Sequence, residues 1–188
     1  MSDWSEGKIA RAIALQTLAR KCVVLVDRCN WTGNECDLLA VTADLRIIDV
    51  EVKISRSDFK ADAKKDKWWH CLSYSEARAR GFDMTQWNPW NQREPRQWPA
   101  KVWKHYVAMP RELWHEKLFD CMASPMSGVL LVSEQRNAVT PIAVHVERRA
   151  TPNKDATRLK PEQVIDIARL ANLRMWEAYK RGKMLEVA

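Results

Sequence analysis

The feature that most constrains the fold is a pair of short apolar runs separated by a polar break. Residues 35–41 read ECDLLAV and residues 45–53 read LRIIDVEVK, with Thr42-Ala43-Asp44 between them. Each run is rich in aliphatic and β-branched residues and is short enough for a strand. The two runs therefore predict a β-hairpin that turns about Asp44.

This hairpin decides which side chains share a face. Facing residues have numbers that sum to about 88, so Asp37 lies opposite Glu51. Because side chains alternate between faces along a strand, one face carries four carboxylates and an amine: Glu35, Asp37, Asp49, Glu51 and Lys53. The other face is apolar and can pack on a core: Cys36, Leu38, Ala40, Ile48, Val50 and Val52.

The negative charges of Asp37 and Glu51 face each other in this hairpin and must be balanced. Directly opposed Cβ atoms lie about 4.5–5.5 Å apart, where like charges are destabilising. A shared proton or a divalent cation would compensate, and oxygen ligands favour a hard ion such as Mg²⁺ or Mn²⁺. Lys53 would then lie within reach of whatever the metal binds. The ordinary alternative stays open, since many strands carry acids on a solvated face.

The Asp37 and Glu51-Val52-Lys53 pattern resembles the PD-(D/E)XK nuclease superfamily. In that superfamily an aspartate on one strand and an ExK triplet on the next bind one or two metal ions for phosphodiester hydrolysis. The likeness is greatest to the MmcB-type DNA repair proteins and related small nucleases of phages and bacteria. Residues 5–12, 50–62, 105–110 and 128–132 carry it. Cys36 stands where the superfamily often has a proline.

The resemblance implies a metal-dependent deoxyribonuclease that acts in DNA repair or in phage or mobile-element DNA processing. Asp37 and Glu51, with the carbonyl group of Val52, would hold Mg²⁺ or Mn²⁺. Lys53 would orient the attacking water or stabilise the transition state. Glu6, expected in the first turn of an N-terminal helix, would be an additional acid at the site; an ordinary first-turn acid is the alternative.

Two further groups of side chains are predicted beside this site. Glu35 lies on the same face as Lys53 and could hold its ammonium group, or it is a plain acid at the rim. A basic stripe recurs at helical spacing on a helix expected from Ser57 to about His70: Arg56, Lys60, Lys64 and Lys67. This stripe could follow a DNA phosphate backbone toward the metal, although solvated lysines are the usual outcome.

Composition agrees with an anionic partner without identifying one. The 188 residues carry a net charge of +7, which favours a polyanion such as DNA. No apolar run approaches the roughly 20 residues of a membrane span, so no membrane partner is expected. The five cysteines form no CxxC pair and are expected to be reduced thiols of a cytoplasmic protein, in a bacterial cell or a phage-infected host.

The remaining elements complete an α/β fold. A helix is expected over residues 5–21, capped by Ser5, and strands over residues 22–27, 105–109, 129–132 and 142–146. This order predicts a restriction-endonuclease-like α/β sandwich over residues 1–150, with a mixed central sheet flanked by helices. Residues 151–188 are expected to form a linker and a long helix that packs on the core or on a second copy, as in a homodimer.

A tryptophan-rich insertion interrupts this order at about residues 76–103. It contains Trp87, Trp90, Trp98 and Trp103 and follows neither the helical nor the strand period, which predicts a long structured loop. Its aromatic rings could stack on exposed bases, or they could fix the loop to the core or to a partner. A non-cleaving accessory module that binds nucleic acid or protein on the same scaffold is therefore the alternative function.

Overall fold

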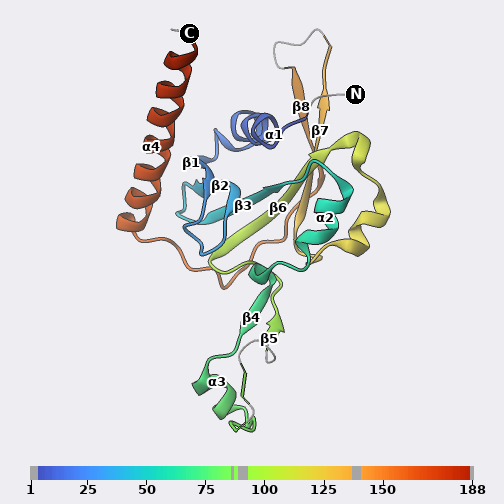
Figure 1. Ribbon diagram of the computed structural model, residues 1–188, viewed down its shortest axis with the longest axis vertical. Coiled ribbons are helices and arrows are strands. Elements are labelled where there is room, and N and C mark those ends of the chain that lie inside the picture. Colours follow the sequence, from blue (N-terminus) through green and yellow to red (C-terminus); the bar gives the residue numbers. More distant parts are fainter. Residues whose placement is uncertain (1–3, 86, 89–92, 137–140, 187–188) are drawn as a thin grey trace.

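A six-stranded mixed sheet forms the centre of the protein (Figure 1). The computed structural model describes residues 4–85, 87–88, 93–136 and 141–186. The strand order is β1-β2-β3-β6-β7-β8, and β6 runs parallel to both β3 and β7 while the other neighbours are antiparallel. The strands are β1 (Cys22–Cys29), β2 (Cys36–Thr42), β3 (Ile47–Val52), β6 (Val102–Pro110), β7 (Gly128–Glu134) and β8 (Ile142–Arg148). The predicted α/β class is confirmed.

The hairpin of β2 and β3 has the predicted register. Its paired residues are Leu38 with Val50, Leu39 with Asp49, Ala40 with Ile48 and Val41 with Ile47. The turn between the strands uses a left-handed backbone at Leu45, with a φ of 62°. The pairing ends at Leu38 and Val50, and Asp37 and Glu51 lie just beyond it, at the open end of the hairpin.

Helix α1 (Glu6–Ile13) covers one face of the sheet. Ser5 caps it, because the Ser5 hydroxyl accepts a hydrogen bond from the backbone N–H of Lys8 at 3.3 Å. Ile9 and Ile13 are buried against five of the six residues predicted to form the apolar face: Leu38, Ala40, Ile48, Val50 and Val52. This burial joins α1 to the hairpin.

The sixth residue, Cys36, was assigned to the wrong face. It packs with Leu39 on the opposite side of the sheet, although the two are three residues apart. Strict alternation is therefore interrupted at Asp37. The neighbouring strand β1 shows the same interruption at Arg28, whose backbone is left-handed with a φ of 44°. Asp37 and Glu51 were predicted to share a face because side chains alternate along a strand. The side chains at this end of β2 do not alternate regularly.

The second face is covered by α2 (Arg56–Asp62) and α4 (Pro161–Glu186). Phe59 of α2 packs over β6 and β7, and Ile167 of α4 packs over β1 and β2. Helix α2 was predicted to run from Ser57 to about His70, and this is wrong at both ends. Its cap is Ser55, whose hydroxyl accepts from the N–H of Asp58 at 3.1 Å. A tight 3-10 turn (Asp66–Trp68) follows the helix, because the chain folds back to bury the side chains at its end.

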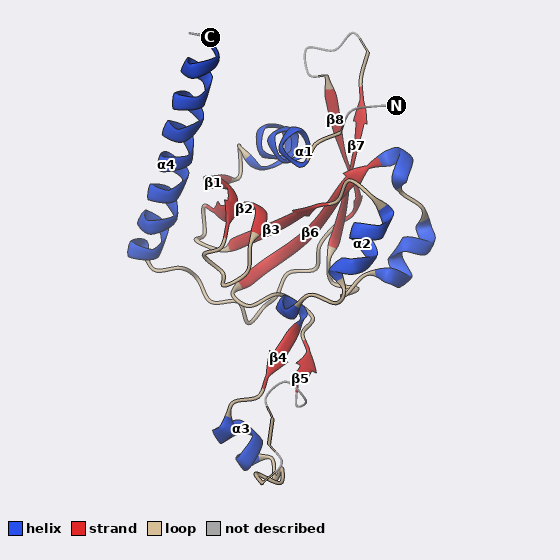
Figure 2. Ribbon diagram, viewed as in Figure 1, coloured by secondary structure: helices blue, strands red, loops and turns tan. Residues whose placement is uncertain are grey.

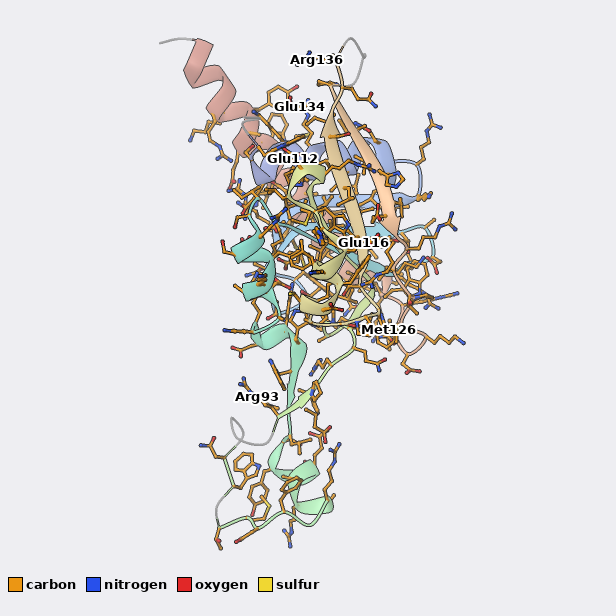
Figure 3. All side chains as sticks on the ribbon, turned by 90° about the vertical axis from the view of Figure 1, so that its right-hand side faces the viewer. Arg93, Glu112, Glu116, Met126, Glu134 and Arg136 are labelled. Carbon is orange, nitrogen blue, oxygen red and sulfur yellow. The ribbon has the colours of Figure 1, made fainter. Side chains whose placement is uncertain are left out.

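The tryptophan-rich insertion forms an arm that projects from the body (Figures 1 and 2). Its base is the antiparallel pair β4 (Trp69–Cys71) and β5 (Arg93–Pro95), and α3 (Tyr74–Ala79) lies beyond them. Figure 3 shows Arg93 on this arm, below the labelled residues of the body. The insertion was predicted to be a long structured loop, and the structure shows that it contains a helix and a strand.

One local sequence signal in the arm starts its helix. Ser73 and Glu76 form a reciprocal capping box that starts α3. Trp103 belongs to β6 rather than to the insertion, and Trp90 lies outside the described residues. Among the residues that the structure describes, no helix has both the length and the apolar character needed to cross a membrane.

Candidate functional site

Asp37 lies at the open end of the hairpin and lines a small hollow. Its carboxylate accepts a hydrogen bond from the backbone N–H of Val52 at 2.7 Å, inside the Glu51-Val52-Lys53 triplet. The hollow has a volume of about 210 Å³ and is lined by Glu6, Gly7, Ala10, Asp27, Arg28 and Asp37. The structure thus brings Asp37 together with Glu6, the acid expected from the first turn of α1.

The electrostatics of this hollow favour a cation. Burial raises the pKa of Asp37, and the hydrogen bond from Val52 opposes that rise. The negative charge of Glu51 raises the pKa further, the positive charge of Lys53 lowers it, and the negative charge of Glu6 raises it. The pKa of Asp37 is raised on balance, and a bound cation would favour the charged form of its carboxylate.

Glu51 has a different environment, because lysine side chains surround it. Its side chain is 3% exposed, and the amine of Lys67 lies 2.6 Å from its Oε1. The amines of Lys53 and Lys65 lie 3.1 Å and 3.3 Å from its Oε2. The sequence argument expected a shared proton or a divalent cation to balance this acid. The structure balances it with three ammonium groups.

Asp62, the last residue of α2, is the second acid of this cluster, and sequence reasoning missed it. Its Oδ1 lies 3.2 Å from the amine of Lys53 and 3.1 Å from that of Lys65. Its Oδ2 accepts a hydrogen bond from the indole N–H of Trp68 at 3.1 Å. A signal was present, since Asp58 and Asp62 are four residues apart on one helix face, and Asp58 also lies 3.8 Å from Lys53.

The lysine cluster is defined here as Glu51, Lys53, Asp62, Lys65 and Lys67. Burial alone would raise the pKa of both carboxyl groups, but the lysine charges outweigh it and hold the pKa of Glu51 and of Asp62 below their usual values. The pKa of Lys53 is raised because the charges of Asp62 and Glu51 outweigh the effect of burial. Glu51, Lys53, Asp62 and Lys65 are therefore charged near neutral pH.

The predicted contact between Lys53 and Glu35 is corrected by this geometry. The acids on its amine are Glu51 and Asp62, in place of the expected Glu35. Glu35 is exposed and lines a shallow surface hollow with Lys64 and Lys67. It lies before the first residue of β2, so the regular pairing does not extend to it.

The predicted basic stripe is corrected for one member. Lys67 is only 4% exposed and points at Glu51, because the chain leaves the helix after Asp62 and turns inward. Arg56, Lys60 and Lys64 are exposed, and the guanidinium of Arg56 donates to the carbonyl of Leu113 at 2.7 Å. The exposed basic side chains on and just after α2 are therefore these three together with Lys65.

A second pair of buried titratable groups lies next to the lysine cluster, on β3 and β6. Burial raises the pKa of Asp49 to about 7. Burial and the charge of Lys67 lower the pKa of His105 to about 3. The His105 ring lies 4.0 Å from Asp49, and its Nδ1 is 2.8 Å from the hydroxyl of Ser127. His105 is therefore a neutral, buried ring.

The residues that the structure describes contain no group of three or more histidine, cysteine, aspartate or glutamate side chains arranged to hold a metal ion. A magnesium ion does not need such a group, because one or two carboxylates with waters and substrate phosphates hold it in many enzymes. Asp37 is the carboxylate best suited to this role. A larger hollow of about 530 Å³ lies at the turn end of the hairpin and does not include Asp37 or Glu51.

Comparisons with known proteins show the fold and no activity. No protein family and no curated protein matches the chain. A solved structure, that of a protein of unknown function from Silicibacter pomeroyi, has a TM-score of 0.52 and 19% sequence identity. The match covers 98% of this chain and 94% of that one. The two proteins therefore share an overall fold over their full lengths.

Proposed function

We propose that this protein is a metal-dependent nuclease that hydrolyses phosphodiester bonds in DNA. The observation that carries the proposal is the convergence at the open end of the hairpin. Asp37 hydrogen-bonds to Val52, lies in the field of Glu51 and shares a hollow with Glu6. These are the acids that the resemblance to the PD-(D/E)XK superfamily named.

The donor set is compatible with a hard cation. The hollow offers the carboxylate oxygens of Glu6, Asp27 and Asp37, which suits Mg²⁺ or Mn²⁺. Arg28 also lines it, as a guanidinium cation that pairs with Asp27 and is no metal ligand. Asp37, with the carbonyl group of Val52, would hold the ion, and Glu6 would bind a second ion or a water. Glu51, which is paired with three lysines, would act on this site through its negative charge. The metal would supply an activated water and neutralise charge on the scissile phosphate.

The protein's own side chains would position the substrate. Lys53 carries a fixed positive charge at the ExK position, held between Glu51 and Asp62, where it would stabilise the charge that develops on the phosphate. The exposed side chains of Arg56, Lys60 and Lys64 would contact the DNA backbone. We expect this activity in the cytoplasm of a bacterial cell or phage-infected host.

Cleavage assays test this proposal. The full chain is incubated with plasmid, single-stranded and flap DNA, with Mg²⁺, with Mn²⁺ and with EDTA. Asp37→Asn should abolish cleavage and weaken metal binding, and Lys53→Met should abolish cleavage while retaining metal binding. Glu134→Gln, an exposed acid at the end of β7, is the matched control and should cut as well as the parent. Unchanged cleavage by Asp37→Asn would refute the site.

The lysine cluster supports a second candidate, a non-cleaving module that binds nucleic acid or protein. Glu51 and Lys53 are each only 2% exposed, and their charges balance without a metal. A purely structural cluster would have this geometry. Metal titration separates the two functions, because a non-cleaving module should bind DNA equally well with Mg²⁺ and with EDTA and should leave every substrate intact.

A further inference from the structure

Helix α4 has an outer face that the fold leaves uncovered. Val164, Ile167 and Ala171 turn toward β1 and β2, where Ile167 is fully buried. On the opposite side, Leu170 is 39% exposed, Leu173 48% and Trp176 61%. Figure 1 shows α4 at the edge of the molecule beside β1, with its C-terminal part extending past the sheet. Three large apolar side chains therefore face solvent on one side of one helix.

These apolar residues belong to a continuous stripe with charged ends. The spacing of three and four residues places seven exposed side chains on one side of α4: Asp166, Arg169, Leu170, Leu173, Trp176, Glu177 and Lys180. This stripe is called the outer stripe below. Its apolar residues form the middle, and an acid and a base lie on each side of Leu173.

When a second copy of the outer stripe runs in the opposite direction, each acid of one copy lies opposite a base of the other. If two copies of α4 cross antiparallel at Leu173, Leu173 meets its own counterpart and Leu170 meets Trp176 of the other copy. Asp166 then faces Lys180, and Arg169 faces Glu177. Each contact occurs twice, as a two-fold axis requires.

A parallel arrangement of the two α4 helices would not pair opposite charges. It would set Asp166 against Asp166 and Lys180 against Lys180, and like charges across an interface are unfavourable. The antiparallel crossing also places the two protein bodies on opposite sides of the helix pair, because the outer stripe faces away from the sheet. The charge pattern therefore selects both the partner and its direction.

We infer that the outer stripe of α4 is a homodimer interface, in which a second copy of this chain packs antiparallel with its two-fold axis at Leu173. The apolar centre excludes water and the four ion pairs around it set the direction. The exposed charges contribute little to affinity, so the apolar centre dominates stability while the charges decide specificity. This inference is independent of the proposed nuclease activity, because assembly needs neither metal nor DNA.

Sedimentation velocity of the full chain over a wide concentration range tests the interface. The parent should show a reversible monomer–dimer equilibrium. Leu173→Glu should raise the dimer dissociation constant about tenfold or more, because it buries two like charges at the axis. Asn172→Glu makes a similar charge change at an exposed position outside the stripe and should leave the constant within about threefold of the parent value.

Exchanging the charges of Asp166 and Lys180 tests the interface without changing its apolar centre. Asp166→Lys and Lys180→Asp should each weaken the dimer, since each sets like charges opposite one another. The double variant restores opposite charges and should recover most of the parent affinity. A parent chain that stays monomeric at every concentration overturns the inference and leaves the stripe to another protein. Equal effects of Leu173→Glu and Asn172→Glu, or no recovery in the double variant, overturn it as well.

Discussion

The hollow at Asp37 and the lysine cluster around Glu51 meet the same electrostatic problem in opposite ways. The two acids are neighbours in the hairpin register, and each is removed from water to a large extent. Around Asp37 burial and the nearby acids raise its pKa, and the hydrogen bond from Val52 and the charge of Lys53 only partly oppose that rise. Around Glu51 the lysines outweigh burial and lower its pKa. The Asp37 carboxylate would be favoured by a positive ligand, whereas the Glu51 carboxylate already pairs with three lysines.

This difference separates a site that can accept a ligand from one that supports the fold. A buried ion pair contributes little to stability compared with apolar residues of the same shape, but the loss of one member is costly. The lysine cluster therefore holds α2 and the turn after it against β3. The hollow is lined by acids from α1, β1 and β2, and the loss of one of these acids is expected to destabilise the protein less than the loss of a member of the lysine cluster. The predictions below test this contrast.

The largest effect is expected from breaking the lysine cluster. Glu51→Gln leaves the buried amines of Lys53 and Lys67 with too few negative partners, and it should lower the free energy of unfolding by about 3–5 kcal/mol. Urea denaturation measures this change, and Glu134→Gln is the exposed control. Adding Lys67→Met to Glu51→Gln should recover part of the loss. An unfolding midpoint unchanged by Glu51→Gln would show that the cluster does not support the fold.

The pH dependence of stability should reveal His105 and Asp49 beside the cluster. The pKa of His105 falls from 6.5 to about 3 on folding, so its contribution to stability is lost as the pH falls from 6.5 toward 3. The pKa of Asp49 rises from 3.8 to about 7, so its contribution is lost as the pH rises through that interval. Each change amounts to a few kcal/mol.

Substitutions separate these two opposed trends. His105→Gln should lose less stability than the parent between pH 6.5 and pH 4, and Asp49→Asn should lose less between pH 4 and pH 7. Urea unfolding at a series of pH values gives both slopes. Slopes identical to that of the parent would contradict the assigned titrations.

A smaller effect is expected when a metal ion enters the hollow. Mg²⁺ or Mn²⁺ at a hundredfold excess over its dissociation constant should stabilise the native state by about 2.7 kcal/mol, as any ligand specific to that state does. Thermal unfolding measures the shift in Tm, which should vanish in Asp37→Ala and persist in Glu134→Gln. A shift that survives Asp37→Ala would place the ion elsewhere.

The smallest effect is expected for Asp37→Asn in the absence of metal. Asparagine keeps an oxygen that can accept from the N–H of Val52, and it removes a charge that the surroundings disfavour. The free energy of unfolding at pH 7 should therefore change by less than about 1 kcal/mol. A loss as large as that of Glu51→Gln would mean that the two acids do not differ in role.

Local patterns were sufficient for much of the fold. The alternation of apolar and polar residues and the turn at Asp44 predicted the register of β2 and β3, because both signals act over a few residues. The same is true of the Ser5 cap and the inward stripe of α1. The capping box of α3 was an equally local signal that the lack of periodicity in the insertion obscured.

The errors arose where packing overrides the local period. Cys36 lies on the unexpected face, next to the left-handed backbone of Arg28 in the paired strand β1. Lys67 fits the helical spacing of Lys60 and Lys64, but α2 ends at Asp62 so that Lys67 and Trp68 can be buried. No single segment contains this information.

The sequence by itself determined the hairpin, its register and the identity of the acids at its open end, since a period of two and a short turn are properties of the local chain. Only the tertiary structure decided which of those acids is balanced. Lys65 and Lys67 reach Glu51 because the chain folds back after α2, and Glu6 reaches the hollow of Asp37 because α1 packs across the sheet. Charge balance depends on distances between segments that are remote in sequence, and packing sets those distances.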